Sequence, residues 1–403
     1  LVEAMQNMDG VEFDLRLTAD GQLVVHHDHT VSISPDMLDG RSELVEEWDL
    51  ADLEDLGFCS FEKLMSDKKW LVPWQEHSKV VCLEIKRSLP VISKDPTKRM
   101  ARIMELATNL VDEAGIGALD IALWDLAGKC CGLSIAQMLG GHRWQLPAYA
   151  STIHGDEQQG GLSHPEAYAD FAESCLELGY PGFKMHGWKE GNPQRESEMI
   201  RSVAKQVGGS MDIMYDAACH LKTLTDAIRV GRVCDEHELL WYEDPYADGG
   251  LTIRGHRALK EKVRTPVMIG EHVRNPEIHT ELLVSGATDF GRVDPDYDGG
   301  ITGSYKAAMA AESLGYDVEV HSCGPAMRQL MAALSRSNYY EINLVHPVGP
   351  NPWQLPVYLN GYSDELDCID REGMVDVSQS PGLGVDYDWE WICLLYTSDA
   401  ADE

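Results

Sequence analysis

The segments MDIMYD (211–216), LLWYE (239–243) and PVMIGE (266–271) decide the fold, because each β-branched or aromatic run ends in an acidic residue. Asp216, Glu243 and Glu271 stand 27 and 28 positions apart, the length of one strand-plus-helix unit. We therefore expect three adjacent parallel strands whose carboxylates meet at the carboxyl ends. Converging carboxylates repel unless a hard cation holds them, and oxygen ligands select Mg²⁺, with Mn²⁺ as the alternative.

The same alternation of strand-like and helix-like stretches continues from residue 146 to residue 345. Amphipathic helices are expected at 165–179 and 304–315. This pattern predicts an α/β fold, a closed (β/α)₈ barrel with its active site at the strand carboxyl ends. The expected strands are 146–151, 182–186, 211–216, 239–243, 266–271, 289–294, 317–321 and 339–344.

The regions outside the repeat differ in character. Residues 91–145 contain two helical patterns, 97–115 and 118–132, and residues 346–392 form a Pro-, Gly- and Trp-rich segment expected to fold back over the barrel or its neighbour. Residues 1–90 carry strand-like runs of their own and do not continue the repeat. The tail 393–403 is interpreted as translated adapter sequence.

Composition limits the functional classes. A net charge of −34 argues against binding to nucleic acid or to anionic membrane surfaces, which use an excess of Lys and Arg. No run of eighteen apolar residues is present, so no membrane-spanning helix is expected. The ten cysteines include no C-x-x-C pair and indicate a reduced, cytoplasmic setting.

Further reactive side chains end the other predicted strands. Lys184 and His186 are two positions apart and so share a face of the second strand. Asp294, at the end of the sixth strand, can orient His321 at the end of the seventh and raise its basicity. Glu341, on the eighth, is expected to hydrogen-bond a developing enolate oxygen. Together these residues suit removal of a proton beside a carboxylate, with a metal stabilising the enolate.

From about residue 91 to 392 the chain resembles the mandelate racemase and muconate lactonizing enzyme group of the enolase superfamily. This resemblance implies Mg²⁺ on Asp216, Glu243 and Glu271, an Asp294–His321 base dyad, a second acid/base position at Lys184, and Glu341 on the enolate. The matching pieces are ALDIALWDLAGK (118–129), LGGHR (139–143), FKMH (183–186), YDAA (215–218), YEDP (242–245), GEH (270–272), VDPDYDGGITG (293–303), VEVHS (318–322) and YYE (339–341).

Two departures from that pattern bear on the substrate. The second strand reads Lys-Met-His where the family often has Lys-x-Lys, so His186 could protonate a leaving hydroxyl. Ala218 stands where galactonate- and mannonate-type dehydratases place a histidine, which disfavours those two substrates. The capping domain of the family is represented only by its helices.

Residues 1–90 resemble part of a glycerophosphodiester phosphodiesterase. The segment VEFDLRLTADGQLVVHHD (11–28) matches that family's metal ligands at Glu12 and Asp14 and its catalytic histidine at His27, and CLEIK (82–86) offers Glu84 as a third ligand. The later strands of that barrel are absent. We therefore interpret residues 89–95 as the junction of two fused fragments.

These observations favour a Mg²⁺-dependent acid-sugar dehydratase, a hydro-lyase acting on a small-molecule carboxylate. A racemase or epimerase would use the same residues, with Lys184 and His321 on opposite faces of the substrate. A phosphodiesterase in the first region and an inactive chimaera remain alternatives. The resemblance also implies a homo-oligomer.

Overall fold

The computed structural model describes residues 10–31, 33, 38, 40–70, 80–85, 102, 103, 106, 107, 117–247, 250–352, 354 and 356–392, without the side chains of 10–12 and 80–85. It divides the chain into two compact units, Leu1–Ala127 and Gly128–Glu403. The sequence placed domain limits at residues 90, 145 and 345, and these stay predictions. The expected helix at 97–115 is described at four residues only, and both the expected junction at 89–95 and the tail 393–403 lie outside the described residues.

The first unit contains a four-stranded sheet in the order β3-β2-β1-β4. Strands β1 and β4 are parallel, whereas β2 pairs antiparallel with both β1 and β3. Phe13, Phe61 and Trp70 are buried against this sheet and pack with ring centroids 6.0 and 5.5 Å from Phe13. The elements are β1 (Gly10–Leu17), β2 (Leu23–Val25), a 3₁₀ turn (Val45–Glu47), α3 (Leu50–Asp55), β3 (Cys59–Ser60), α4 (Phe61–Ser66), β4 (Val80–Ile85) and α7 (Gly117–Cys131), which crosses the division between the units.

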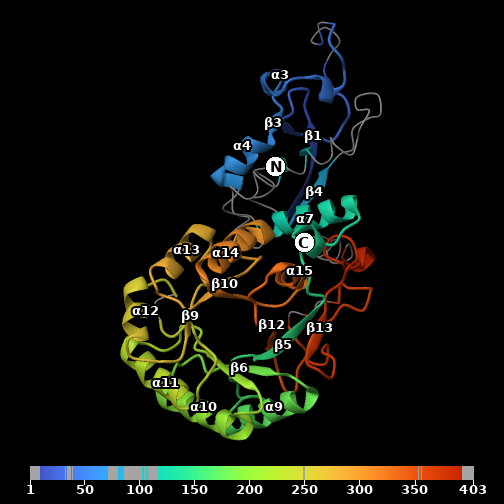
Figure 1. The fold of residues 1–403 in the computed structure, drawn as a ribbon. Helices are drawn as coiled ribbons and strands as arrows, with labels where there is room; N and C mark the ends of the chain where they lie inside the picture. The colour runs from blue at the N-terminus through green and yellow to red at the C-terminus, as the bar shows by residue number, and fades with distance from the viewer. Residues whose placement is uncertain are drawn as a thin grey trace. The chain divides into compact units, whose positions relative to one another are not determined.

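The second unit is a (β/α)₈ barrel, which confirms the predicted fold class. Parallel ladders join its strands in the order β12-β5-β6-β7-β8-β9, and a second ladder joins β10 to β11. Figure 1 shows the helices α9 to α14 arranged around the outside of these strands. The strands are β5 (Gln145–Thr152), β6 (Gly182–His186), β7 (Asp212–Asp216), β8 (Tyr242–Glu243), β9 (Val267–Met268), β10 (Phe290–Val293), β11 (Asp317–Val320) and β12 (Tyr340–Val345).

Individual main-chain and side-chain hydrogen bonds connect the two pairs of neighbouring strands, β9 with β10 and β11 with β12, that no described ladder joins. Between β9 and β10, Asp289 N donates to Val267 O (2.7 Å) and Val267 N donates to Asp289 Oδ2 (2.8 Å). Between β11 and β12, Asn338 Nδ2 donates to the buried Glu319 at 2.6 Å. The barrel therefore closes through polar side chains, of which Glu319 is buried, as well as through main-chain pairs.

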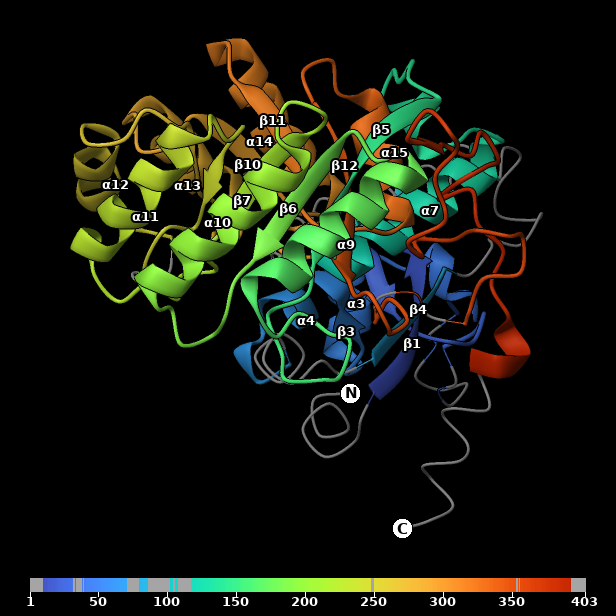
Figure 2. The same ribbon diagram turned by 90° about the horizontal axis from the view of Figure 1, so that it is seen from below.

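Helix starts follow from short capping signals in the sequence. Asn192 and Asn275 accept main-chain hydrogen bonds at the starts of α10 and α13, and each is followed by a proline, whose fixed φ suits the first helical turn. Figure 2 shows α9 and α10 side by side along the outside of β6 and β7. The helices are α8 (Ile135–Met138), α9 (Pro165–Leu178), α10 (Pro193–Val207), α11 (Leu224–Glu236), α12 (Ile253–Lys260), α13 (Pro276–Val284), α14 (Gly300–Leu314) and α15 (Pro325–Ala333).

The segment after the barrel returns to it. Strand β13 (Met374–Asp376) pairs antiparallel with the first residues of β5. Arg328 on α15 donates to Asp364 of this segment at 2.6 Å, which fixes the return against the barrel. No helix in the described part of the chain is long and apolar enough to cross a membrane.

Candidate active site

The acidic residues of the three decisive segments lie together at one rim of the barrel. Asp216 is the last residue of β7 and Glu243 the last of β8, and the ladder sets them opposite each other. Glu271 lies three residues beyond β9, after Gly270, because the regular ladder ends at Met268. One carboxylate oxygen from each residue lies within 4.8 Å of the other two. We call Asp216, Glu243 and Glu271 the carboxylate triad.

The triad fits a hard divalent cation. Asp216 and Glu243 are fully buried, whereas 21% of the Glu271 side chain is exposed. Among the described residues, Asp216 Oδ2 and Glu243 Oε1 accept no hydrogen bond of good geometry and have only charged neighbours. A buried carboxylate is stable only when nearby positive charge or hydrogen-bond donors offset the loss of its hydration. An oxygen-only, convergent and partly accessible donor set is the kind that Mg²⁺ or Mn²⁺ takes.

A histidine–aspartate pair stands at the Glu271 end of the triad. His321 Nδ1 donates to Asp294 Oδ2 at 2.5 Å, which leaves His321 Nε2 facing Glu271 Oε1 at 3.4 Å. Burial would lower the pKa of His321, but the charges of Glu271 and Asp294 raise it to about 9. The main-chain nitrogen of Asp296 donates to Asp294 Oδ1 at 2.7 Å and fixes this carboxylate. The imidazole is therefore oriented with one nitrogen free to exchange a proton toward the triad.

The turn that follows Asp294 requires glycine. Gly299 and Gly300 have φ angles of 76° and 82°, a left-handed conformation that costs other residues energy. A Cβ atom at Gly303 would lie 1.7 Å from Asp298 O. Asp298 Oδ2 in turn accepts a hydrogen bond from Asp294 N at 2.7 Å. The sequence GGITG thus forms the tight strand-to-helix connection that holds Asp294.

Lys184 lies beneath the triad and is fully buried. Its Nζ is 2.9 Å from Glu243 Oε2, 2.9 Å from Glu341 Oε1 and 3.5 Å from Asp216 Oδ2. Burial alone would lower the pKa of Lys184, but Glu243 and Glu341 raise it well above its usual range. In this arrangement Lys184 is a cation that neutralises the carboxylates around it.

Arg292 is a second buried cation, and the sequence reasoning missed it. Its Nε is 2.8 Å from Glu243 Oε1, and its NH2 donates to Glu341 Oε2 at 2.9 Å. The available signal was a charged residue two positions before Asp294 in an otherwise apolar strand, on the same face as Asp294. Glu341 also accepts from Ser322 N at 2.8 Å, so here it accepts hydrogen bonds, and its expected bond to an enolate stays a prediction.

His186 stands at the other end of the triad. Its ladder partner is Asp216, and its Nε2 is 3.0 Å from Asp216 Oδ2. Its Nδ1 contacts Thr152 O at 2.6 Å, so both ring nitrogens face acceptors and the ring is suited to carry a proton. The rings of His154 and His186 lie 5.2 Å apart, and those of His154 and His220 5.0 Å apart. The predicted residue His186 is therefore part of a histidine-lined side of the rim.

The residues predicted in the first unit are only partly described. Asp14 is buried, and the register of β1 and β4 sets it beside Glu84, but the side chains of Glu12 and Glu84 lie outside the described residues. His27 Nδ1 lies 2.8 Å from Asp28 Oδ1, and 70% and 58% of the two side chains are exposed. The candidate metal-ligand groups found among the described side chains both belong to the second unit.

A second group that sequence reasoning did not assign consists of Cys219, Asp244 and His272. One ligand atom from each lies within 4.8 Å of the others. Nothing in the hydrophobic pattern of the sequence marks these residues as neighbours. The available signal was their position in three consecutive strand-to-helix connections, where Asp244 and His272 directly follow Glu243 and Glu271 and Cys219 follows Asp216 by three positions.

Comparisons with known proteins relate this chain to two families. The model described as "Enolase C-terminal domain-like" matches residues 167–391, and that of the mandelate racemase / muconate lactonizing enzyme N-terminal domain matches residues 79–140. The model of the glycerophosphoryl diester phosphodiesterase family matches residues 3–104. The last two matches overlap around the predicted junction.

Several relatives are sugar-acid dehydratases. L-talarate/galactarate dehydratase of Salmonella typhimurium is 27% identical over 67% of this chain and 62% of its own, and D-gluconate/D-galactonate dehydratase of Picrophilus torridus is 26% identical over 70% and 71%. The chain thus spans less than two thirds of the Salmonella enzyme. The crystal structure of D-glucarate dehydratase from Agrobacterium tumefaciens complexed with magnesium is similar with a TM-score of 0.65 and 28% identity, over 94% of this chain and 88% of that one.

The barrel, the carboxylate triad with its flanking histidines, and a family model that matches residues 167–391 agree with one another. This chain belongs to the enolase superfamily, in the group of mandelate racemase and muconate lactonizing enzymes.

Proposed function

We propose that this chain is a Mg²⁺-dependent dehydratase of acid sugars, with Mn²⁺ as a substitute ion. The observation that carries the proposal is the histidine at each end of the carboxylate triad. His321 Nε2 lies 3.4 Å from Glu271 Oε1, and His186 Nε2 lies 3.0 Å from Asp216 Oδ2. Dehydration needs a base for one proton and an acid for the departing hydroxyl, so a proton acceptor and a proton donor on two sides of the substrate suit it.

The names of the relatives support this reaction class. The proteins from Salmonella typhimurium and Picrophilus torridus are dehydratases of acid sugars, as is the magnesium-complexed structure from Agrobacterium tumefaciens. A substrate of this class is an anion, and a net charge of −34 would repel it unless the site were locally positive. Lys184 and Arg292 offset part of the negative charge of Glu243 and Glu341, and a divalent cation on the triad would supply the positive charge that the substrate needs.

The proposed reaction begins with proton removal. A divalent cation held by Asp216, Glu243 and Glu271 would polarise the substrate carboxylate and so acidify the adjacent C–H bond. His321 Nε2 takes that proton, while Asp294 stabilises the imidazolium through Nδ1. Because the pKa of His321 is raised chiefly by Glu271 and Asp294 against the effect of burial, a cation on Glu271 would offset part of that shift and favour the neutral base.

Loss of the hydroxyl completes the proposed reaction. The enolate pair of electrons forms the new C–C double bond as the β-hydroxyl leaves, and His186 supplies the proton that converts the hydroxyl into water. The resulting enol takes up a proton at C3, loses its hydroxyl proton and becomes a 2-keto-3-deoxy acid. Lys184 and Arg292 balance the charge on Glu243 and Glu341 during these steps.

Incubation of the purified chain and Mg²⁺ with a library of aldonic and aldaric acids tests the proposal. At least one acid is expected to give a 2-keto-3-deoxy product that reacts with semicarbazide, and chelation of the metal should stop its formation. If no acid in the library gives such a product while the protein is folded, the proposal is wrong. Exchange of the α-proton for solvent deuterium without loss of water would instead indicate a racemase or epimerase, with Lys184 as the second base.

A further inference from the structure

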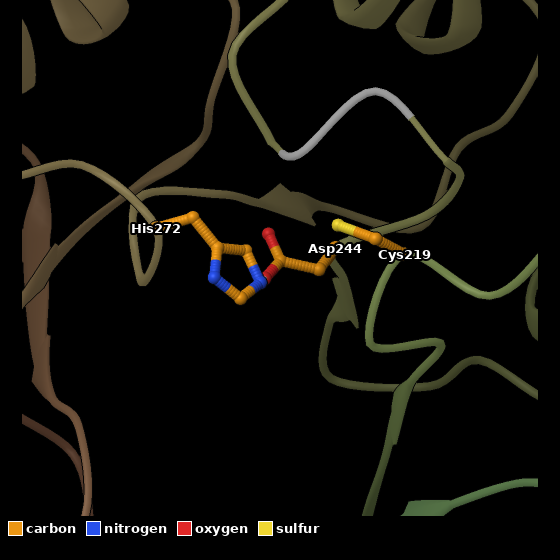
Figure 3. A group of neighbouring side chains, drawn as sticks. All are labelled: Cys219, Asp244 and His272. Atoms are coloured by element: carbon orange, nitrogen blue, oxygen red, sulfur yellow. The ribbon is translucent and has the colours of Figure 1, made fainter. Parts of the chain in front are cut away.

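Three consecutive strand-to-helix connections bring Cys219, Asp244 and His272 together beside the triad. Asp244 and His272 directly follow the triad residues Glu243 and Glu271 in the sequence, and Cys219 follows Asp216 by three positions. A sulfur, an oxygen and a nitrogen, one from each side chain, lie within 4.8 Å of one another. In Figure 3 the Asp244 carboxylate lies between the His272 ring and the Cys219 thiol.

Direct contacts hold these three residues in place. Cys219 N donates to Asp244 O at 2.9 Å, and His272 Nε2 lies 3.1 Å from Asp244 Oδ2. Cys219 and Asp244 have φ angles of 58° and 36°, in the left-handed region that residues other than glycine rarely occupy. Such backbone strain persists only where the surrounding structure imposes it, so the two side chains are fixed on a preformed frame.

The Asp244 carboxylate is the part of this group that needs a ligand. The residue is fully buried, and among the described residues its Oδ1 accepts no hydrogen bond. Its one charged contact within 4 Å in the described part of the chain is His272, through the other oxygen. A buried carboxylate oxygen that lacks a donor is costly unless a cation or another partner compensates it. His272 is 39% exposed and leaves a route to solvent.

We propose that Cys219, Asp244 and His272 form a second cation site, separate from the triad, that takes a borderline-soft divalent metal of the Zn²⁺ type. Thiolate and imidazole ligands select Zn²⁺ and its transition-metal analogues, whereas the oxygen-only triad selects Mg²⁺. Three protein ligands leave one tetrahedral position for water or another ligand. The two neighbouring sites therefore discriminate between ions by donor chemistry.

A purely structural role makes a different prediction. If Asp244 and His272 form only an ion pair that braces the two connections, the Cys219 thiol takes no part and no transition metal binds with sulfur ligation. The spectrum of bound Co²⁺ separates these cases, because a thiolate ligand gives an intense near-ultraviolet charge-transfer band that oxygen and nitrogen ligands do not give.

The experiment is a Co²⁺ titration of the folded full chain in saturating Mg²⁺, which occupies oxygen-only sites. The wild type should develop a thiolate-to-cobalt band that saturates at one Co²⁺ per chain and disappears when Zn²⁺ is added. Cys219→Ser should lose the band, whereas the matched control Cys368→Ser, at another partly buried cysteine, should keep it. Absence of the band from the wild type, or its persistence in Cys219→Ser, overturns the proposal.

A second measurement needs no variant and so does not depend on folding of a mutant. Iodoacetamide alkylation of each cysteine is followed by peptide mass mapping with and without Zn²⁺, in saturating Mg²⁺. Zn²⁺ should protect Cys219 and leave the exposed Cys59 and Cys130 as reactive as before. Equal alkylation of Cys219 under both conditions contradicts the site, even if the barrel proves to be a dehydratase.

Discussion

The two units of this chain both carry charged side chains at strand ends, but they surround them differently. In the barrel, Asp216 and Glu243 are fully buried and face Lys184 and Arg292. In the first unit, His27 and Asp28 contact each other with 70% and 58% of their side chains in solvent. Charges act strongly on one another in a low-dielectric interior and weakly in water. The charges at the barrel rim therefore act on one another strongly, whereas His27 and Asp28 act on each other weakly.

The largest expected effect tests whether the barrel rim carries the reaction. Glu243→Gln removes a charge from the triad, and we expect turnover of the acid-sugar substrate to fall by about 10³-fold, since one preorganised electrostatic contact contributes this much. Glu54→Gln, in the first unit, removes a carboxylate that pairs with Lys63 near the surface and should leave turnover unchanged. Steady-state kinetics at saturating Mg²⁺ provide the measurement. An equal loss of turnover in the two variants would contradict the claim that the barrel rim carries the reaction.

The second-largest expected effect is the loss of turnover when His321, the proposed base, is replaced. His321→Asn keeps a side chain able to hydrogen-bond Asp294 but removes the proton acceptor, and turnover should fall by about 10²–10³-fold. The KM for the substrate should change little, because binding does not depend on the imidazole. Comparison of kcat with KM therefore separates a catalytic role from a general loss of structure. A raised KM with normal kcat would contradict the assignment.

Buried ion pairs allow the two units to be compared for stability. Arg292→Met removes a positive charge that offsets the buried carboxylates of Glu243 and Glu341. We expect it to lower the free energy of unfolding by about 3 kcal/mol. Arg16→Met in the first unit should have a similar effect, because Arg16 and Glu46 are equally buried, with side-chain exposures of 2% and 1%. Urea unfolding monitored by fluorescence gives these values. The exposed control Arg201→Met, which breaks a pair with Glu236, should cost less than about 1 kcal/mol.

The smallest expected effect is a pH dependence in the barrel wall. Glu196 accepts from Trp188 N and Tyr215 Oη, each at 3.0 Å, and burial raises its pKa to about 7. A raised carboxyl pKa gives stability that is fully present below the unfolded pKa and is lost as pH rises through the folded value. Between about pH 5.5 and about pH 8.5 the wild type should therefore lose about 2 kcal/mol that Glu196→Gln does not lose. Parallel urea titrations of both proteins measure the difference.

The sequence predicted the parts of the site that depend on strand period. His186, Asp216 and Glu243 form one row across β6, β7 and β8 because equal strand-plus-helix lengths return the chain to the same rim. Strand β6 was predicted to the residue, 182–186. Glu271 was expected on its strand but lies in the following turn, since β9 forms only two ladder residues before the chain bends at Gly270.

What the sequence did not predict depends on tertiary contacts. Arg292 was read as part of a strand, and its role as a counter-charge appears only when β10 is set opposite Glu341 of β12. The group of Cys219, Asp244 and His272 arises from turns with left-handed residues, which no hydrophobic period encodes. The domain limits near residues 90 and 145 and the roles of Glu12 and Glu84 stay predictions.

The most direct test of the central claim, that this rim forms an enolate, is proton NMR of the accepted acid sugar in D₂O. With the wild type and Mg²⁺, a 2-keto-3-deoxy product should appear that carries one deuterium at C3, because the enol takes its new proton from the solvent, and this product should not accumulate with Glu243→Gln or after chelation of the metal. Formation of product without deuterium at C3, or equal turnover by Glu243→Gln, would contradict the account.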